Sequence, residues 1–318
     1  MMKGVGMKSI TVRMTAAVLM LAVLVLGLAG FGPLPVTTQT GDAPAEDNGH
    51  ELPPEERQAL LDDMAQEATQ PQTAPNSVCA VQSWRPGRPQ NTARSRGGLT
   101  YAAFNGRFYL VGGEGTGANR DIPIEEYNPL TGRWTDRAHL ITGVSNTGAA
   151  AIDQYIYIPG GYTGMVYLQT TQRYNIAANT LTTVASLPTV LGGHAVAAFG
   201  NSWQPRAALP VAVHFAAAVS DGDYIYVLGG NSTDESTVQR YNPATDAWLL
   251  IPGLNAGRGG PAGFFDGRNV WAVAGGWSSY LTSSEYWDGI QWQAGPALST
   301  GARTLGAAFG GGLALKAG

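Results

Sequence analysis

The chain has 318 residues, of which 13% are charged, with 43 glycines and a formal net charge of −4. This length suits one large domain or two small ones, and the composition is typical of an all-β protein with many turns. No basic field is present, which excludes nucleic acid as an expected partner. The single Cys79 excludes an intramolecular disulfide and any metal or redox motif built on paired cysteines.

Residues 1–32 have the form of an export signal. Lys3, Lys8 and Arg13 precede an uncharged apolar run over residues 14–32, with small residues near its end. This run would form an apolar helix of 19 residues, which is also long enough to span a bilayer without cleavage. We therefore expect a cleaved signal peptide or a retained membrane anchor, and in either case a secreted or extracytoplasmic protein.

Residues 33–76 have the composition of an acidic, disordered linker. Over residues 36–78, nine acidic residues stand against one base, Arg57, and there is little apolar surface to bury. Within this linker, residues 54–68 could form one short acidic helix, because a proline and two glutamates open it. The folded domain is expected to occupy residues 77–318.

A repeated pattern begins near residue 84. An apolar strand ends on a glycine pair, a polar loop follows, the next strand carries a tyrosine, and a last strand contains a tryptophan. The spacing is 48 residues from Gly112 to Gly160 and 46 residues from Gly229 to Gly275. The glycine pairs are Gly112, Gly113, Gly160, Gly161, Gly229, Gly230, Gly275 and Gly276. The repeated aromatic residues are Tyr127, Trp134, Tyr174, Trp203, Tyr241, Trp248, Tyr286 and Trp292.

The local chemistry of each repeat favours strands that surround an axis. Hairpin signals precede three of the apolar strands, at Asn105-Gly106, Asp221-Gly222 and Asp266-Gly267, because such dipeptides supply the positive φ of a two-residue turn. The strands before these turns are rich in alanine and glycine, which suits the crowded innermost strand of a propeller blade. We interpret the repeated Tyr and Trp as packing between blades rather than as sugar-stacking residues.

A repeat of this length with a glycine pair and a downstream Tyr and Trp resembles kelch repeats, which are about 50 residues long. No repeat carries both the Gly-His and the Trp-Asp dipeptides that mark WD-type repeats. The resemblance covers roughly residues 84–318. It implies an all-β, kelch-type β-propeller, here of a secreted bacterial type.

The blade count follows from two irregularities. The segment around Trp84 looks like the closing strand of a blade, and the first two strands of that blade lie at the C-terminus. We therefore expect this blade to be split between the two ends of the chain. Because no third strand follows, we also expect the chain to be cut short. Only 69 residues separate Gly160 from Gly229, which suggests that one blade has lost its second and third strands. The sequence predicts six nominal blades, with a five-blade ring as the alternative.

Polar residues next to the innermost strands are the candidates for a binding site. Because such positions come together at one mouth of a propeller channel, we expect these side chains to ring it. The candidates are Arg96, Asn146, His194, His214, Arg258 and Arg303. The competing interpretation is that the arginines pair with Asp or Glu of nearby strands and that the histidines are structural. We predict no catalytic residue, no metal and no cofactor.

The resemblance implies three functions. The first is an extracellular binding module that presents loops at one face to a protein or glycan ligand. The second is a secreted sugar-modifying enzyme similar to sialic acid mutarotases or galactose oxidase, although no ligand set for copper is identifiable around the two histidines. The third is a structural fragment of a longer cell-surface protein. Membrane contact is expected only through an uncleaved N-terminal helix.

Overall fold

The computed structural model describes residues 11–12, 81, 83–198, 205–303 and 306–317. Within these ranges the chain is all-β, apart from one 3-10 turn, η1 (Thr116–Ala118). The predicted signal or anchor, except for two of its residues, and the predicted linker lie outside the described residues. The part of the chain that the structure describes contains no apolar helix of the length that crossing a bilayer requires.

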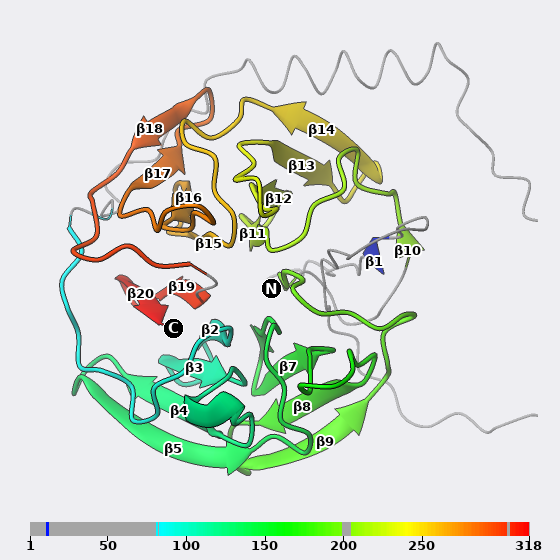
Figure 1. Cartoon of the computed structure of the whole chain (residues 1–318), viewed down its shortest axis with the longest axis vertical. Helices are drawn as coiled ribbons and strands as arrows, with labels where there is room; N and C mark the ends of the chain where they lie inside the picture. Colours follow the sequence, from blue (N-terminus) through cyan, green and yellow to red (C-terminus); the bar gives the residue numbers. More distant parts are fainter. Residues whose placement is uncertain (1–10, 13–80, 82, 199–204, 304–305, 318) are drawn as a thin grey trace, which may run out of the picture.

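Four antiparallel sheets of four strands each form the blades of a ring (Figure 1). In every blade the chain runs from the innermost strand outward, so that strands adjacent in sequence are paired. Blade one contains β2 (Gly98–Ala102), β3 (Arg107–Val111), β4 (Pro123–Asn128) and β5 (Arg133–His139). Blade two contains β6 (Ala150–Ile152), β7 (Tyr155–Pro159), β8 (Thr171–Asn175) and β9 (Thr180–Val184). Blade three contains β11 (Ala217–Ser220), β12 (Ile225–Leu228), β13 (Val238–Asn242) and β14 (Ala247–Ile251). Blade four contains β15 (Ala262–Phe265), β16 (Val270–Val273), β17 (Ser284–Trp287) and β18 (Trp292–Ala294).

Within the described residues, two positions of the ring hold fewer than four strands. Between blades four and one lies a two-stranded antiparallel sheet of β19 (Gly306–Gly310) and β20 (Leu313–Ala317). Between blades two and three, residues 194–198 take the place of an innermost strand. Their Val196 side chain lies so close to Gly148 that a Cβ there would approach it to 2.6 Å.

The described residues therefore form four complete blades of an all-β propeller, and six blades are not confirmed. The loss of two strands that the sequence predicts after Gly200 stays a prediction, because residues 199–204 lie outside the described residues. The next described element is β10 (Pro205–Arg206), which pairs with β1 (Thr11–Val12) in parallel. Trp203, expected to close this blade, lies outside the described residues.

The predicted split blade differs from expectation. No strand pairing joins residues 83–90 to β20 in the described structure. Trp84 instead packs edge-on against Phe264 of β15, with ring centroids 6.2 Å apart. This segment and β20 line one cleft, and no described strand lies between them.

The glycine pairs allow one blade to hydrogen-bond the next. The amide of Gly113 donates to Val144 O, and that of Gly230 donates to Arg258 O, each at 2.8 Å. A Cβ on the preceding Gly112 would lie 2.6 Å from the Val144 carbonyl, and its φ of 58° is left-handed. In blade four the equivalent residues are Ala274 (φ 55°) and Gly275, whose amide donates to Ala302 O at 2.8 Å. The predicted pair Gly275–Gly276 is thus shifted by one residue.

The repeated aromatic residues pair across the third and fourth strands. Tyr127 lies opposite Trp134 and Tyr241 opposite Trp248, with ring centroids 5.0 and 4.9 Å apart. Tyr174 occupies the same position opposite Leu181. In blade four this position belongs to Trp287, not to the predicted Tyr286, because Trp287 is the residue opposite Trp292.

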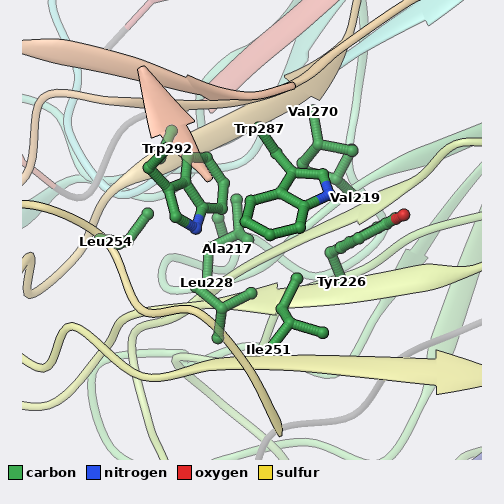
Figure 2. Close-up of a cluster of buried hydrophobic side chains, with 11 residues drawn as sticks. Ala217, Val219, Tyr226, Leu228, Ile251, Leu254, Val270, Trp287 and Trp292 are labelled. Atoms are coloured by element: carbon green, nitrogen blue, oxygen red, sulfur yellow. The ribbon is translucent and has the colours of Figure 1, made fainter. Parts of the chain in front are cut away.

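The fourth-strand tryptophans also connect blades. The indole nitrogens of Trp134, Trp248 and Trp292 donate to carbonyls of Arg88, Ala207 and Pro252, segments that precede their own blades. Figure 2 shows the core between blades three and four, where the rings of Trp287 and Trp292 lie beside Leu228, Ile251 and Leu254. These contacts agree with the interpretation of the repeated aromatics as packing residues.

Candidate binding site at the channel mouth

Five residues, which precede β2, β6, residues 194–198, β11 and β15, surround the mouth of the channel, and four backbone hydrogen bonds link them; we call them the ring residues. The amide of Asn146 donates to Arg96 O, that of Gly193 to Asn146 O, that of Phe215 to Gly193 O, and that of Gly260 to Phe215 O, at 2.9–3.0 Å. All five residues are left-handed, with φ between 52° and 69°. This repeated conformation turns the chain from the preceding loop into the innermost strand and defines the mouth of the channel.

The loops on the same side as this ring form what we call the mouth face. It consists of the loops before each innermost strand and after each second strand, since antiparallel neighbours bring these ends together. The segments are residues 91–97, 112–122, 140–149, 160–170, 185–193, 207–216, 229–237, 252–261, 274–283 and 295–303. The hairpin turns between first and second strands lie at the opposite face.

The ring encloses a cavity of about 80 Å³ whose lining includes Arg96, Asn146, His194, Phe215 and Pro261. At the other end of the channel, the innermost strands line a wider opening with alanines, including Ala150, Ala197, Ala218 and Ala308. The small side chains predicted for the innermost strands thus bring these strands together around the axis.

Three of the five ring residues carry side chains, although a left-handed backbone favours glycine. Asn tolerates this conformation, whereas a bulky side chain in it is uncommon and costs free energy. Phe215, with a φ of 52°, is therefore the most costly of the three. Backbone strain of this kind is frequent at ligand-binding positions.

The structure brings three of the predicted site residues together: Arg96, Asn146 and His194 all line the mouth cavity. His214 is not among its lining residues and packs its ring against that of Phe215, at 5.1 Å. The two histidines are not equivalent in the repeat, because His214 precedes a ring residue and His194 follows one.

Arg258 does not reach the mouth. Its side chain is buried inside blade four and pairs with Glu285 of β17 at 2.8 Å. It also donates to the carbonyls of Ala274 and Ser283. Arg258 therefore fits the competing interpretation, in which a loop arginine pairs with a carboxylate of a nearby strand.

His194 is buried, and both of its ring nitrogens lack a hydrogen-bond partner within the described residues. Burial lowers the pKa of His194 to about 4, although the nearby carbonyl of Pro159 acts in the opposite direction. The ring is therefore neutral at pH 7, with polar atoms available beside the mouth cavity.

Arg303 belongs to a row of aromatic residues on the mouth face. The rings of Phe215 and Trp277 stack at 5.2 Å. The Arg303 guanidinium lies 4.3 Å from the ring centre of Trp277 and 4.9 Å from that of Tyr280. Contacts of this type hold aromatic side chains in place at the surface. The row runs from the ring across blade four, and its outer member, Tyr280, is 57% exposed.

Asp234 fixes the loop that carries Trp277. Its carboxylate accepts hydrogen bonds from the amides of Gly259, Trp277 and Ser278. Partial burial alone would raise the pKa of Asp234, but these donors outweigh it and lower the pKa below its usual value. The aromatic row is thus positioned before any ligand arrives.

A second patch on the mouth face is apolar. In the loop of blade two, Met165 is 87% exposed, and Val166 and Tyr167 are also exposed. Val190, on the loop that bridges to this one through Leu168 and Leu191, is exposed as well. Clustered apolar side chains at a surface are typical of protein-interaction sites.

The polar residues near Arg96 form a network. Arg96 lies 3.6 Å from Glu114, which also pairs with Arg120. Arg120 donates to Ser145 Oγ at 3.0 Å and lies over the ring of Tyr162. This network connects the ring to the loops of blades one and two.

Sequence reasoning missed a bracing position two residues before each repeated third-strand aromatic. There, Glu125 and Glu285 accept backbone amides of the preceding loop and pair with Arg94 and Arg258. In blades two and three the residue is glutamine, and its amide group both accepts from and donates to one backbone unit. These glutamines are Gln172, bonded to Thr142, and Gln239, bonded to Val211. When the repeats are aligned, Glu at this position occurs together with an Arg in the preceding loop, and Gln occurs without one. This correlation could have identified the position from the sequence.

No group of three or more His, Cys, Asp or Glu side chains gathers within the described residues.

The comparisons with known proteins agree with this architecture. Residues 212–255 match the Kelch motif. The chain is 27% identical over 129 residues to the spermatocyte protein spe-26 of Caenorhabditis elegans, covering 38% of this chain and 23% of that protein. It is 22% identical over 234 residues to kelch-like protein 25 of Xenopus tropicalis, covering 59% of this chain and 39% of that protein. Kelch-like protein 31 of Danio rerio is 40% identical over 77 residues, 23% of this chain and 12% of that protein.

The fold is a kelch-type propeller. The matches support a kelch-repeat protein, and the region with the Kelch motif corresponds to blade three together with the loops before and after it. In these three cases the chain spans less than two-fifths of the relative's length.

Proposed function

We infer that this propeller is a protein-interaction module that binds its partner through the mouth face. The observation that carries this proposal is the aromatic row of Phe215, Trp277 and Tyr280, fixed by Arg303 and by the Asp234 carboxylate. Large aromatic and arginine side chains dominate the binding energy of protein interfaces. Kelch propellers typically serve this purpose, which makes the mouth face the first surface to test.

The apolar patch of Met165, Val166 and Tyr167 extends the proposed interface across the mouth. Between this patch and the aromatic row lies the polar cavity with Arg96 and His194. A partner with apolar side chains at both edges and a hydrogen-bonding group at the centre would match this arrangement.

A protein ligand is favoured over a glycan for one reason. The cavity at the centre has a volume of about 80 Å³, which is below the range of small-molecule pockets. We retain glycan binding as an outcome of the test. The extracytoplasmic location remains a proposal that rests on the apolar segment at residues 14–32.

The experiment is a selection of binders from a displayed peptide library on the immobilised full-length chain, alongside a glycan array. Selected peptides are expected to bind at least ~10-fold more weakly to Trp277→Ala and to Met165→Asp. Leu130→Asp is the matched control, because Leu130 is 86% exposed but lies on the turn at the opposite face. Binders that depend on Leu130 and ignore both mouth variants, or a chain that binds only glycans, would contradict the proposal.

A further inference from the structure

The mouth cavity is lined by hydrogen-bond donors and by no acidic side chain. Among the described residues around its volume of about 80 Å³, Arg96 is cationic, Asn146 and Thr147 are polar, and His194 carries an imidazole, whereas Asp and Glu are absent. A cavity of this volume has room for several waters, and hence for a group of a few non-hydrogen atoms. The lining therefore suits a small group that accepts hydrogen bonds.

His194 is the lining residue that indicates a ligand. Its side chain is buried, with the whole residue 6% exposed, and neither ring nitrogen has a hydrogen-bond partner within the described residues. Buried polar atoms almost always have such a partner, so an exception requires an explanation. An imidazole with two unsatisfied nitrogens beside a polar cavity is explained by a group that binds there.

The surroundings of His194 decide what kind of group this is. The carbonyl of Pro159 lies near the ring and accepts a hydrogen bond from Thr147 Oγ at 3.0 Å. A ring nitrogen that faces a carbonyl oxygen must carry a proton, because two acceptors repel each other. To donate to a group in the cavity as well, the ring needs a second proton, and both nitrogens of the charged imidazole are donors. A negatively charged ligand would stabilise that form.

The charges beside the cavity also favour an anion. Arg96 and Arg120 both lie next to Glu114, and no other described carboxylate pairs with either of them. Two cations and one anion leave one positive charge. Arg120 makes the closer contact with Glu114, whereas Arg96 lies 3.6 Å away with a side chain that is 46% exposed. The Arg96 guanidinium therefore has donors to offer to a second carboxylate, which it can bind through two parallel hydrogen bonds.

We propose that the mouth cavity binds one carboxylate group through Arg96, Asn146 and His194, and that His194 takes up a proton from solvent as the carboxylate enters. The charged ring then donates to the Pro159 carbonyl and to the carboxylate, so that both of its nitrogens gain partners. The single surplus positive charge matches a monoanion, and the small volume favours a carboxylate over a larger oxyanion.

Proton uptake makes the affinity for a carboxylate rise as the pH falls. Without a ligand, burial holds the pKa of His194 at about 4, and a carboxylate within hydrogen-bond distance raises it. Of the groups around His194, only His214 has an ordinary pKa that is also near neutral pH. The described charged or titratable groups on the surrounding segments are Arg96, Glu114, Arg120, Tyr162, Tyr167 and His214.

The carboxylate has two possible sources, a free small carboxylate or an Asp or Glu side chain of a protein partner. The second source rests on the proposed function, because the cavity lies at the centre of the mouth face. The first source does not, so the two can be separated. Sodium acetate is the probe for the first source, and the peptide N-acetyl-Gly-Asp-Gly-amide is the probe for the second.

The experiment is thermal unfolding of the full-length chain with each probe at constant ionic strength. Acetate should raise the melting temperature, whereas acetamide, which has the same shape without the charge, should not. The apparent affinity for acetate should be at least ~10-fold higher at pH 5.5 than at pH 7.5, because binding takes up a proton. NMR spectra of the chain with labelled histidines should show His194 change from the neutral to the charged form as acetate is added at pH 5.5.

Glycine variants remove the donors without disturbing the backbone. Arg96 and Asn146 are left-handed, and glycine already occupies the same position at Gly193 and Gly260. Arg96→Gly should weaken acetate binding by at least ~10-fold, and Asn146→Gly should weaken it less. Arg268→Gly is the matched control, because it removes the same charge from an exposed hairpin turn at the opposite face.

Histidine variants test the proton. His194→Gln should abolish the pH dependence of acetate binding, whereas His214→Gln should retain it. Binding of acetate alone assigns the site to a free carboxylate, and tighter binding of the peptide assigns it to a partner's side chain. Acetate binding by a chain for which no protein ligand is found would contradict the proposed function but not this site. The site is overturned if acetate and acetamide act alike, or if Arg96→Gly and His194→Gln respond to acetate as the unaltered chain does.

Discussion

Blade three and the two-stranded sheet β19–β20 begin in the same way and end differently. Both have an innermost strand of small residues, a tight turn and a second strand, with 12 residues from the first paired residue to the last. Blade three continues through Gln239, Tyr241 and Trp248, which brace the loop, fill the space between blades and donate to the preceding segment. Of the residues equivalent to these three, the described part of the chain supplies only Trp84 beside the sheet β19–β20.

The difference shows that the inner hairpin and the outer strands are held by different interactions. The hairpin is determined by local turns and by close packing around the axis, and in β19–β20 it is described without a third or fourth strand. The outer strands depend on the third strand, because its bracing residue and its aromatic residue contact the loop and the fourth strand. Removing single parts of a complete blade tests this division.

The largest effect is expected from the buried pair of Arg258 and Glu285. Arg258→Ala leaves a buried carboxylate without its partner, which should lower the free energy of unfolding by about 3–5 kcal/mol. Blade three uses Val213 and Gln239 at the equivalent positions, so the double variant Arg258→Val with Glu285→Gln should recover much of this loss. Denaturant unfolding of the three chains measures it, and a double variant as unstable as Arg258→Ala would contradict the equivalence.

The tryptophans compare the two regions directly. Trp248→Ala removes a buried ring, its contact with Tyr241 and its hydrogen bond, and should cost about 3–5 kcal/mol. Trp84→Ala removes a half-buried ring with no hydrogen bond, and should cost about 1–2 kcal/mol. Equal losses in thermal unfolding of the two variants would show that Trp84 is as well integrated as its counterpart in a complete blade.

The other incomplete part of the ring, residues 194–198, should be sensitive to acid. The pKa of His194 is about 4 in the fold against an ordinary value of 6.5, so the unfolded chain binds the proton more readily. Its contribution is complete above pH 6.5 and is lost as the pH falls to about 4, a loss of about 3 kcal/mol.

His194→Gln should flatten this part of the pH–stability curve, measured by denaturant unfolding between pH 4 and 7. His214→Gln retains the buried His194 and should keep the slope, which makes it the matched control. A slope that persists in His194→Gln would assign the acid sensitivity to other groups.

The smallest change in the free energy of unfolding is expected for the left-handed ring residues, which precede complete blades and residues 194–198 alike. Arg96 has a φ of 62°, its side chain is 46% exposed, and its guanidinium lies 3.6 Å from the carboxylate of Glu114. Arg96→Gly should therefore raise the free energy of unfolding by about 1 kcal/mol, because glycine adopts this conformation without a steric penalty. A lower melting temperature would mean that the contact with Glu114 outweighs the backbone cost.

The sequence predicted the repeat, the hairpins and the kelch-type propeller, because glycine pairs and periodic aromatic residues have direct structural causes. The predicted glycine pair of blade four was wrong by one residue, because Ala274 adopts the left-handed conformation that a glycine adopts in the other three blades. The same shift led to Tyr286 in place of Trp287. Spacing alone could not distinguish these registers.

The site was less predictable for a related reason. Arg96, Asn146 and His194 reach the mouth cavity, whereas Arg258, two positions earlier in the repeat than Arg96, turns into the blade. A difference of two positions in a loop decides whether a side chain meets the channel or a buried glutamate. The aromatic row could not be predicted, because its members come from two loops that are far apart in sequence: Phe215 precedes blade three, whereas Trp277 and Tyr280 follow the second strand of blade four.

The most direct test of the comparison is hydrogen–deuterium exchange of the second strands in the full-length chain. Leu313–Ala317 should exchange faster than Arg107–Val111, Ile225–Leu228 and Val270–Val273, since alternate amides of β20 have no partner strand. Protection of Leu313–Ala317 equal to that of these three second strands would show that the amides of β20 are as well paired as theirs and would contradict the account.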